Sequence, residues 1–321
     1  MKRIILLSFL FSVFTSFNVK KPQISSTRID QFGYAVAKSK EAVWASELSR
    51  KIKSFMLIDS VTNKIVYKSK AGKAMEKGSL EAFAQKKVIT DKFGAMIRGD
   101  TLTKKIALVF TGDEFADGGV DILKTLKSEK IKSSFFLTGR FYSTLEFKPL
   151  ISQLKVEGHY LGAHSDQHLL YCDWVKRDSL LVTRQQFIED LNNNYRRIQE
   201  YGVSKADAPY FLPPYEWYNS AIVKWTAQEG LQLINFSPGT RSTADYTWPE
   251  LGKSYRSSDE IYQSIIEREE KDPNGLNGFI LLIHIGTDPR RTDKFYLRLP
   301  ELLHELKERG YTFERIDQML D

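Results

Sequence analysis

Residues 104–114 read KKIALVFTGDE, an unbroken apolar run that ends abruptly in polar residues. The segment Ile106–Phe110 carries no polar side chain on either face, which is typical of a strand buried on both sides in a parallel sheet. A helical pattern follows at Val120–Glu129. A strand followed by a helix is half of the βαβ unit from which parallel sheets are built.

The same alternation of strands and helices continues to the C-terminus. Further strands are expected at Ser133–Thr138, Tyr160–Ala163, Tyr210–Leu212, Gln232–Phe236 and Phe279–Ile283. Further helices are expected at Phe147–Glu157, Thr183–Tyr201, Ser220–Glu229, Ser258–Glu270 and Leu299–Arg309. Six or seven repeats over about 215 residues favour a closed barrel over an open sheet. In such barrels the chemistry lies on the loops that follow the strands.

The region before the barrel has a different pattern. Ser54–Asp59 (SFMLID) and Lys64–Lys68 (KIVYK) predict a β-hairpin, and Lys92–Arg98 predicts another strand. At the N-terminus, Lys2 and Arg3 precede the apolar run Ile4–Phe17. This run is shorter than the roughly 20 residues of a membrane-spanning helix and is typical of a secretory signal.

These patterns predict three regions: a signal peptide at 1–18, a β-rich N-terminal region at 19–101 and the barrel at 102–321. We therefore expect an exported protein (periplasmic, cell-surface or extracellular) with no integral membrane span. An uncleaved N-terminal anchor is the alternative, because no Ala-x-Ala-like cleavage site is present.

Composition excludes several function classes. The 47 Lys and Arg against 40 Asp and Glu give a net charge of +7, and the basic residues are spread along the chain. No nucleic-acid partner is expected from this pattern. The single cysteine excludes an intrachain disulfide framework and a cysteine-based metal cage. The chain has only five histidines, so their positions are informative.

Three of these histidines follow predicted strands. His164 and His168 form a His-x-x-x-His pair after one strand, and His284 ends another. Two imidazoles at this spacing can share a metal ion. Asp113 and Glu114 follow Ile106–Phe110 and supply carboxylates for ligation and base catalysis. The set predicts a hydrolytic metal site with open positions for water and substrate.

The order of these motifs resembles the polysaccharide deacetylases of carbohydrate esterase family four, or NodB-homology domain, from about Lys105 to the C-terminus. The family's Thr-Phe-Asp-Asp-Gly is similar to Thr111–Phe115. Its His-Ser/Thr-x-x-His matches His164–His168, and its Leu-x-His matches Leu282–His284. The resemblance implies a distorted (β/α) barrel of about seven strands.

The resemblance also implies removal of acetyl groups, N- or O-linked, from a carbohydrate polymer or oligosaccharide. A divalent metal, zinc with cobalt or nickel as alternatives, would be held by Glu114, His164 and His168. Asp113 would take a proton from the metal-bound water, and His284 would protonate the leaving group. The remaining implied roles are oxyanion stabilisation by the Tyr215 backbone N–H and an acetyl pocket lined by Leu282.

Several positions depart from the family pattern. Glu114 stands where the family has Asp, and Asp117 is a rival ligand. Leu212 occupies the position of the arginine that orients the base, and Arg241 is the candidate replacement. For the family's Asp–Trp motif, the nearest residues are Asp245 and Trp248. Glu216 replaces a glycine.

One alternative function follows. These departures leave open a catalytically impaired glycan-binding protein that retains the deacetylase barrel.

The N-terminal region shows a second resemblance. The segment Arg28–Tyr34 and the hairpin after it resemble the immunoglobulin-like domain that precedes some cellulase modules, although about 75 residues is short for a full sandwich.

Overall fold

The computed structural model of the protein describes residues 25–29, 42–46, 54–58, 65–70 and 88–320. The chain forms two compact units, residues 1–84 and 85–321. The first contains two antiparallel strand pairs, which are β1 (Ser25–Ile29) with β2 (Ala42–Ser46) and β3 (Ser54–Ile58) with β4 (Ile65–Lys70). The predicted hairpin is therefore confirmed. The signal segment 1–18 lies outside the described residues.

A single curled sheet forms the centre of the second unit. Its strands are β5 (Ile89–Thr90), β6 (Met96–Arg98), β7 (Lys105–Gly112), β8 (Ser134–Leu137), β9 (Tyr160–Ala163), β10 (Tyr210–Phe211), β11 (Gln232–Leu233), β12 (Phe279–His284) and β13 (Thr312–Glu314). The order is β11-β10-β9-β8-β7-β12-β6-β5, with β13 beside β7. Strands β7 to β13 pair in parallel, and β5 and β6 are antiparallel. The expected distorted α/β barrel is confirmed.

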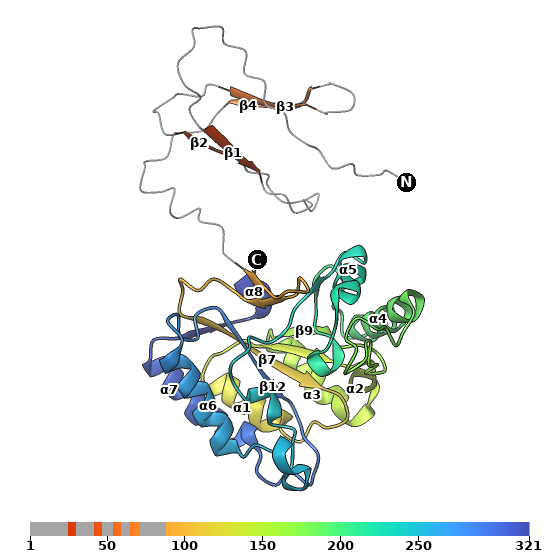
Figure 1. Ribbon diagram of the computed structural model, residues 1–321, viewed down its shortest axis with the longest axis vertical. Helices are drawn as coiled ribbons and strands as arrows, with labels where there is room; N and C mark the ends of the chain where they lie inside the picture. The colour runs from red at the N-terminus through yellow and green to blue at the C-terminus, as the bar shows by residue number, and fades with distance from the viewer. Residues whose placement is uncertain (1–24, 30–41, 47–53, 59–64, 71–87, 321) are drawn as a thin grey trace. The chain divides into compact units, whose positions relative to one another are not determined.

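Helices surround the central strands (Figure 1). They are α1 (Gly119–Ser128), α2 (Gly139–Ser143), α3 (Lys148–Val156), α4 (Arg184–Gln199), α5 (Ser220–Gln228), α6 (Ser258–Lys271), α7 (Leu299–Glu308) and α8 (Ile316–Leu320). Short 3₁₀ turns are η3 (Leu145–Phe147), η4 (Pro214–Glu216), η5 (Ser242–Ala244), η6 (Pro249–Ser254) and η7 (Phe295–Arg298). None of the helices in the described ranges is long and apolar enough to cross a membrane.

The two sides of the curled sheet approach each other through the segment after β11. Asn235 N–H donates to the Met96 carbonyl (2.8 Å), and Ser237 N–H donates to the Ile280 carbonyl (3.0 Å). These bonds satisfy backbone groups that would otherwise form open sheet edges. The predicted strand Lys92–Arg98 is shorter in the structure, because Asp91 accepts hydrogen bonds from Phe93 N–H and Ala95 N–H in a turn before β6.

The core explains why the central strands are apolar on both faces. Residues 106–110 of β7 and 279–283 of β12 are completely buried. Each large apolar side chain buried in this way contributes about 1.5–3 kcal/mol relative to exposure. Since β7, β9 and β12 run in parallel, their carboxyl ends open at the same rim of the barrel. The residues that follow them are therefore brought to one end of the unit.

Candidate active site

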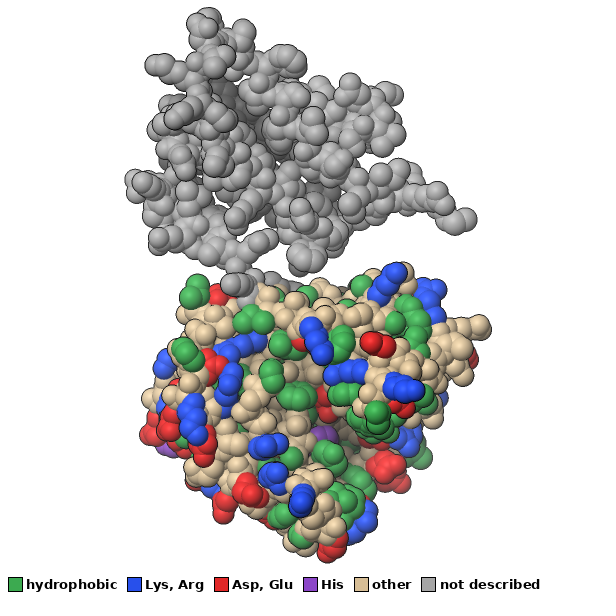
Figure 2. Space-filling view, viewed as in Figure 1, with side chains coloured by type: hydrophobic (Ala, Val, Ile, Leu, Met, Phe, Trp, Pro, Cys, Tyr) green, Lys and Arg blue, Asp and Glu red, His purple; other side chains and the backbone are tan. Residues whose placement is uncertain are grey.

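A cavity of about 900 Å³ lies at this rim. Its lining includes Asp113, Glu114, His164, His168, Tyr215, Glu216, Trp248 and His284. Figure 2 shows a histidine in the middle of the visible face of this unit, among acidic, basic and hydrophobic side chains. The structure therefore brings the acidic pair and all three strand-end histidines to one cavity.

Helix α4 supports the loop of residues 164–168 after β9, which we call the histidine loop. Asn194 accepts a hydrogen bond from His164 N–H (2.8 Å), and Asp190 accepts one from Gln167 N–H (2.9 Å). Asp190 and Asn194 are four residues apart and therefore lie on one face of the helix. Thr183 and Gln186 form a capping box that starts α4 at the correct point to present this face.

The two imidazoles lie side by side, with ring centroids 5.2 Å apart. His164 Nδ1 is 2.8 Å from the Leu212 carbonyl oxygen, which can only accept, so the proton is on Nδ1 and Nε2 keeps its lone pair. Burial holds the pKa of His164 well below 6.5, and His168 lowers it further. Burial also lowers the pKa of His168 to about 4, although Asp113 opposes this. Both rings are therefore neutral at pH 7, the state in which imidazole binds metal.

Asp113 is held by two neighbours from the start of α2. The Thr138 hydroxyl donates to Asp113 Oδ1 (2.9 Å). The Arg140 guanidinium donates through Nε to Oδ1 (3.1 Å) and through Nη2 to Oδ2 (2.5 Å). The His168 ring lies on the other side, with Nδ1 3.7 Å from Asp113 Oδ2. The carboxylate plane is thus fixed by a bidentate contact.

Glu114 and Asp117 occupy different environments. The Glu114 side chain is 61% exposed, and its Oε1 lies 3.4 Å from Arg140 Nη1. Asp117 binds Lys294 (2.8 Å), the Tyr296 hydroxyl (2.9 Å) and Thr287 N–H (2.7 Å). Burial alone would raise the pKa of Asp117, but these three donors lower it. Both Asp117 oxygens are therefore engaged away from the histidine pair.

His284 is paired with Asp245. Its Nδ1 lies 2.6 Å from Asp245 Oδ1, and its backbone N–H donates to Asp245 Oδ2 (2.8 Å). Burial alone would lower the pKa of His284, but the charge and hydrogen bond of Asp245 outweigh it and raise the pKa. The proton on Nδ1 belongs to the contact with Asp245, which leaves Nε2 as the other titrating atom of the ring.

This pairing predicts the effect of Asp245→Asn on the pH dependence of catalysis. Without the carboxylate, burial dominates and the pKa of His284 falls. A general acid must be protonated to act, so the basic limb of kcat should move to lower pH. At pH 8 we expect about a tenfold lower kcat. Asp288→Asn removes another carboxylate of the cavity and should leave the basic limb in place. An unmoved limb in Asp245→Asn would contradict the assignment.

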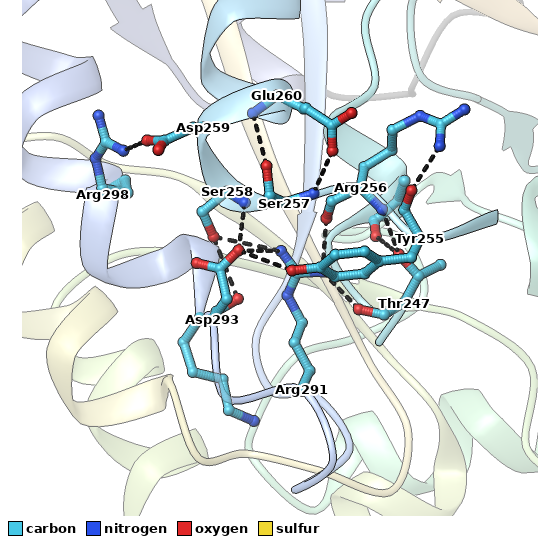
Figure 3. A network of polar contacts seen from close by, with 12 residues as sticks. Thr247, Tyr255, Arg256, Ser257, Ser258, Asp259, Glu260, Arg291, Asp293 and Arg298 are labelled. Atoms are coloured by element: carbon cyan, nitrogen blue, oxygen red, sulfur yellow. Dashed lines mark hydrogen bonds and ion pairs between the residues drawn. The ribbon is translucent and has the colours of Figure 1, made fainter. Parts of the chain in front are cut away.

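A buried arginine holds the loop that carries Asp245 (Figure 3). Arg291 is completely buried and donates to the carbonyls of Thr247 (2.5 Å) and Arg256 (2.9 Å). Asp293 lies beside it, 3.7 Å from Arg291 Nη2, and accepts from Ser258 N–H (2.6 Å). The segment after β12 is thereby joined to the segment between η5 and α6.

Arg291→Met is expected to destabilise this unit strongly. The substitution leaves the buried Thr247 carbonyl and the half-buried Arg256 carbonyl without their donor, and we expect the free energy of unfolding to fall by about 3 kcal/mol. Arg290→Met is the matched control, because Arg290 is exposed and pairs with Asp288 at the surface. Its loss should cost less than about 1 kcal/mol. Denaturant unfolding of both variants measures the difference, and equal losses would contradict a supporting role for Arg291.

The Pro-Pro-Tyr-Glu turn has an unusual backbone. Tyr215 and Glu216 both have positive φ, 58° and 52°, as do Ser165 (72°) and His168 (55°) of the histidine loop. Such conformations cost free energy in non-glycine residues and persist where surrounding contacts hold them. Burial raises the pKa of Glu216 to about 7, His284 opposes this and Asp245 adds to it.

The other candidate residues are placed differently. Trp248 lines the cavity, with the Arg290 guanidinium 3.8 Å from its ring centre. Leu282 is completely buried in β12 and is not among the lining residues of this cavity. Arg241 lines a separate depression with Arg256 and Glu260, and its backbone N–H donates to Ser264. The structure does not bring Arg241 to Asp113.

The sequence patterns missed Arg140, Thr138, Asp190 and Asn194. A signal existed for the last two, because they are polar residues on the otherwise apolar face of a predicted helix. Arg140 lies in a helix of five residues, too short to show periodicity, and Thr138 is the residue that caps this helix. Asp245 is the residue nearest to the family's Asp–Trp motif, but the sequence does not indicate its contact with His284.

The curled sheet carries a fixed aspartate after β7, a histidine pair after β9 and a histidine at the end of β12. This is the arrangement that the resemblance to the NodB-homology domain implies. Residues 98–234 match the family model Polysaccharide deacetylase, which confirms the resemblance of this part of the chain to the NodB-homology domain. Residues 23–98 match Cellulase N-terminal ig-like domain, in agreement with the resemblance of the N-terminal region.

Relatives and solved structures agree with this placement. Peptidoglycan-N-acetylmuramic acid deacetylase PdaA of Bacillus subtilis is 25% identical over 75% of this chain and 80% of its own length. A peptidoglycan-N-acetylglucosamine deacetylase of Bacillus cereus is 24% identical over 68% of this chain and 88% of its own.

Two solved structures share the fold. That of B. subtilis PdaA has a TM-score of 0.54 and 24% identity, and covers 71% of this chain and 85% of its own. A CE4 family pseudoenzyme from Bacillus anthracis has a TM-score of 0.54 and 19% identity, and covers 71% and 69%.

Proposed function

We propose that the protein is a metal-dependent hydrolase that removes acetyl groups from a carbohydrate polymer or oligosaccharide. The observation that carries the proposal is the convergence of a fixed carboxylate, two neutral imidazoles and a His–Asp pair on one cavity. Peptidoglycan glycan strands are the first substrate to test, because relatives of this chain are named for their action on them.

The metal would be held by His164, His168 and Glu114. The neutral histidines fit such a site, since the His164 proton is engaged by a carbonyl and Nε2 is left as a donor atom. Among the described residues, no three His, Cys, Asp or Glu side chains stand close enough to hold an ion in their present positions. Glu114 would have to exchange its exposed contact with Arg140 for the metal, a contact worth little in water. When bound, a divalent cation supplies Lewis-acid activation of water and of the acetyl carbonyl.

The protein's own residues would move the protons. Water attacks the acetyl carbonyl carbon, and its proton passes to Asp113. The Tyr215 backbone N–H would donate to the oxygen that becomes negative. His284 then gives a proton to the leaving nitrogen or oxygen as the bond to the acetyl carbon breaks. The products are acetate and a free amine or hydroxyl on the sugar.

Aromatic side chains at the rim support a sugar substrate. Trp174 is 53% exposed and lies against Trp217, with ring centroids 5.4 Å apart. The Arg177 guanidinium lies 3.6 Å from the Trp217 ring centre. Exposed aromatic faces of this kind can cover the apolar face of a pyranose ring.

We place the protein outside the cytoplasm on the pattern of Lys2, Arg3 and Ile4–Phe17.

Acetate release is the direct test. The full chain, loaded with zinc, cobalt or nickel, is incubated with peptidoglycan glycan strands, chitooligosaccharides and acetylated xylan. We expect acetate from at least one of them. No acetate from any substrate with any metal would overturn the proposal.

A second candidate function is glycan binding without catalysis. It is favoured by the contact of Glu114 with Arg140 and by Leu212 at the position of the family arginine. It predicts oligosaccharide binding, measured by calorimetry, that Asp113→Asn leaves unchanged, together with no acetate release by the unmodified chain.

A further inference from the structure

We propose that Arg140 is the positioning residue for Asp113, supplied by the start of α2. The inference rests on the proposed function, in which Asp113 is the base. Arg140 is the only arginine or lysine that forms an ion pair with Asp113 within residues 88–320. Its guanidinium engages both carboxylate oxygens, so it fixes the plane of the carboxylate as well as its distance.

The backbone of Arg140 is itself anchored to the loops that it serves. Arg140 N–H donates to the Asp166 carbonyl (3.2 Å), and Gly139 N–H donates to the Ser165 carbonyl (3.0 Å). Thr138 N–H donates to the Gly112 carbonyl (3.0 Å). The start of α2 is therefore joined to the loop after β7 and to the histidine loop after β9.

Position 139 allows this close approach only because it is glycine. A Cβ atom there would lie 1.7 Å from Asp166 Oδ1, well inside contact distance. Any side chain at 139 would push the start of α2, and Arg140 with it, away from the histidine loop. The backbone of Arg140 is consequently held in one position, from which its guanidinium reaches Asp113.

Thr138 completes the arrangement. Its hydroxyl oxygen accepts from Phe141 N–H (3.1 Å), which caps α2, while the hydroxyl hydrogen goes to Asp113. The same hydroxyl therefore starts the helix and supports the carboxylate. Because its oxygen is committed to the cap, the direction of its hydrogen is set toward Asp113.

The other candidate positions cannot supply the contact. Leu212 is completely buried and apolar, and only its backbone carbonyl takes part, by accepting from His164. Arg241 lies in another depression. Arg140 also contacts the second carboxylate, because its Nη1 lies 3.4 Å from Glu114 Oε1, but that contact is single and exposed, whereas the contact with Asp113 is bidentate.

The test uses the full chain and three substitutions of Arg140. Without the bidentate contact from the guanidinium, the Asp113 carboxylate can rotate out of its productive position. Arg140→Ala should therefore lower kcat for acetate release by about 100-fold. Substrate binding does not use this contact, so KM should stay within about twofold. Arg140→Lys keeps the charge without the bidentate geometry and should recover only part of the loss. Arg140→Gln is the fallback if the alanine variant fails to fold.

Two comparisons separate positioning from general destabilisation. In an Asp113→Asn background, Arg140→Ala should cause no further loss, because the group it orients is no longer a base. Arg197→Ala is the matched control, since Arg197 lies exposed on α4 and pairs only with Glu200 among the described residues. It should leave kcat unchanged.

The outcomes distinguish the two proposals. If Arg140→Ala keeps the unmodified kcat, or lowers activity further by a similar factor in the Asp113→Asn background, the role of Arg140 is overturned while the proposed function stands. If the unmodified chain releases no acetate, the proposed function falls and the inference falls with it.

Discussion

Asp113→Asn is expected to lower the rate of acetate release by about 10³-fold, the typical contribution of a positioned general base. The amide cannot take the proton of the attacking water. It still accepts from Thr138 and fills the same space beside Arg140, so the fold should be retained. Steady-state acetate assays, together with thermal unfolding of the variant, measure the two effects separately.

The control for this prediction is Asp117→Asn. Asp117 is another carboxylate in the loop after β7, but its oxygens bind Lys294, Tyr296 and Thr287. We expect Asp117→Asn to lower thermal stability and to leave kcat within about threefold of the unmodified chain. A larger loss of kcat in Asp117→Asn than in Asp113→Asn would reverse the assignment of the base.

Metal removal is expected to have an effect of similar size. A chelator should lower acetate release by at least about 10³-fold, because the metal that activates water is removed. Added zinc, cobalt or nickel should restore the activity. His164→Ala and His168→Ala should each reduce the metal content, measured by mass spectrometry, to a small fraction of one ion per chain.

His304→Ala is the control for metal content. His304 lies on α7 with its side chain 72% exposed, close to Glu308, and is not one of the cavity residues. Its substitution should leave one ion per chain. Full activity after exhaustive chelation, or unchanged metal content in His164→Ala, would exclude the proposed metal site.

Much of the fold was predictable because its signals are local. The strand expected at Phe279–Ile283 is β12 (Phe279–His284), and the helix expected at Leu299–Arg309 is α7 (Leu299–Glu308). Continuous apolar runs define the buried strands, and amphipathic periodicity defines the helices that cover them. The short elements were missed, above all α2 and β13, because a few residues carry neither signal.

The candidate site divides along the same line. The sequence alone determined the alternation of strands and helices in the barrel. It also determined that Asp113, His164, His168 and His284 lie at strand ends. Only the tertiary structure decided that Arg140, 27 residues from Asp113, holds that carboxylate, and that Asp245, 39 residues from His284, holds that ring. The reason is physical. A strand or a helix is specified by neighbours along the chain, whereas an ion pair across the rim depends on how the curled sheet and its loops bring distant backbone segments together.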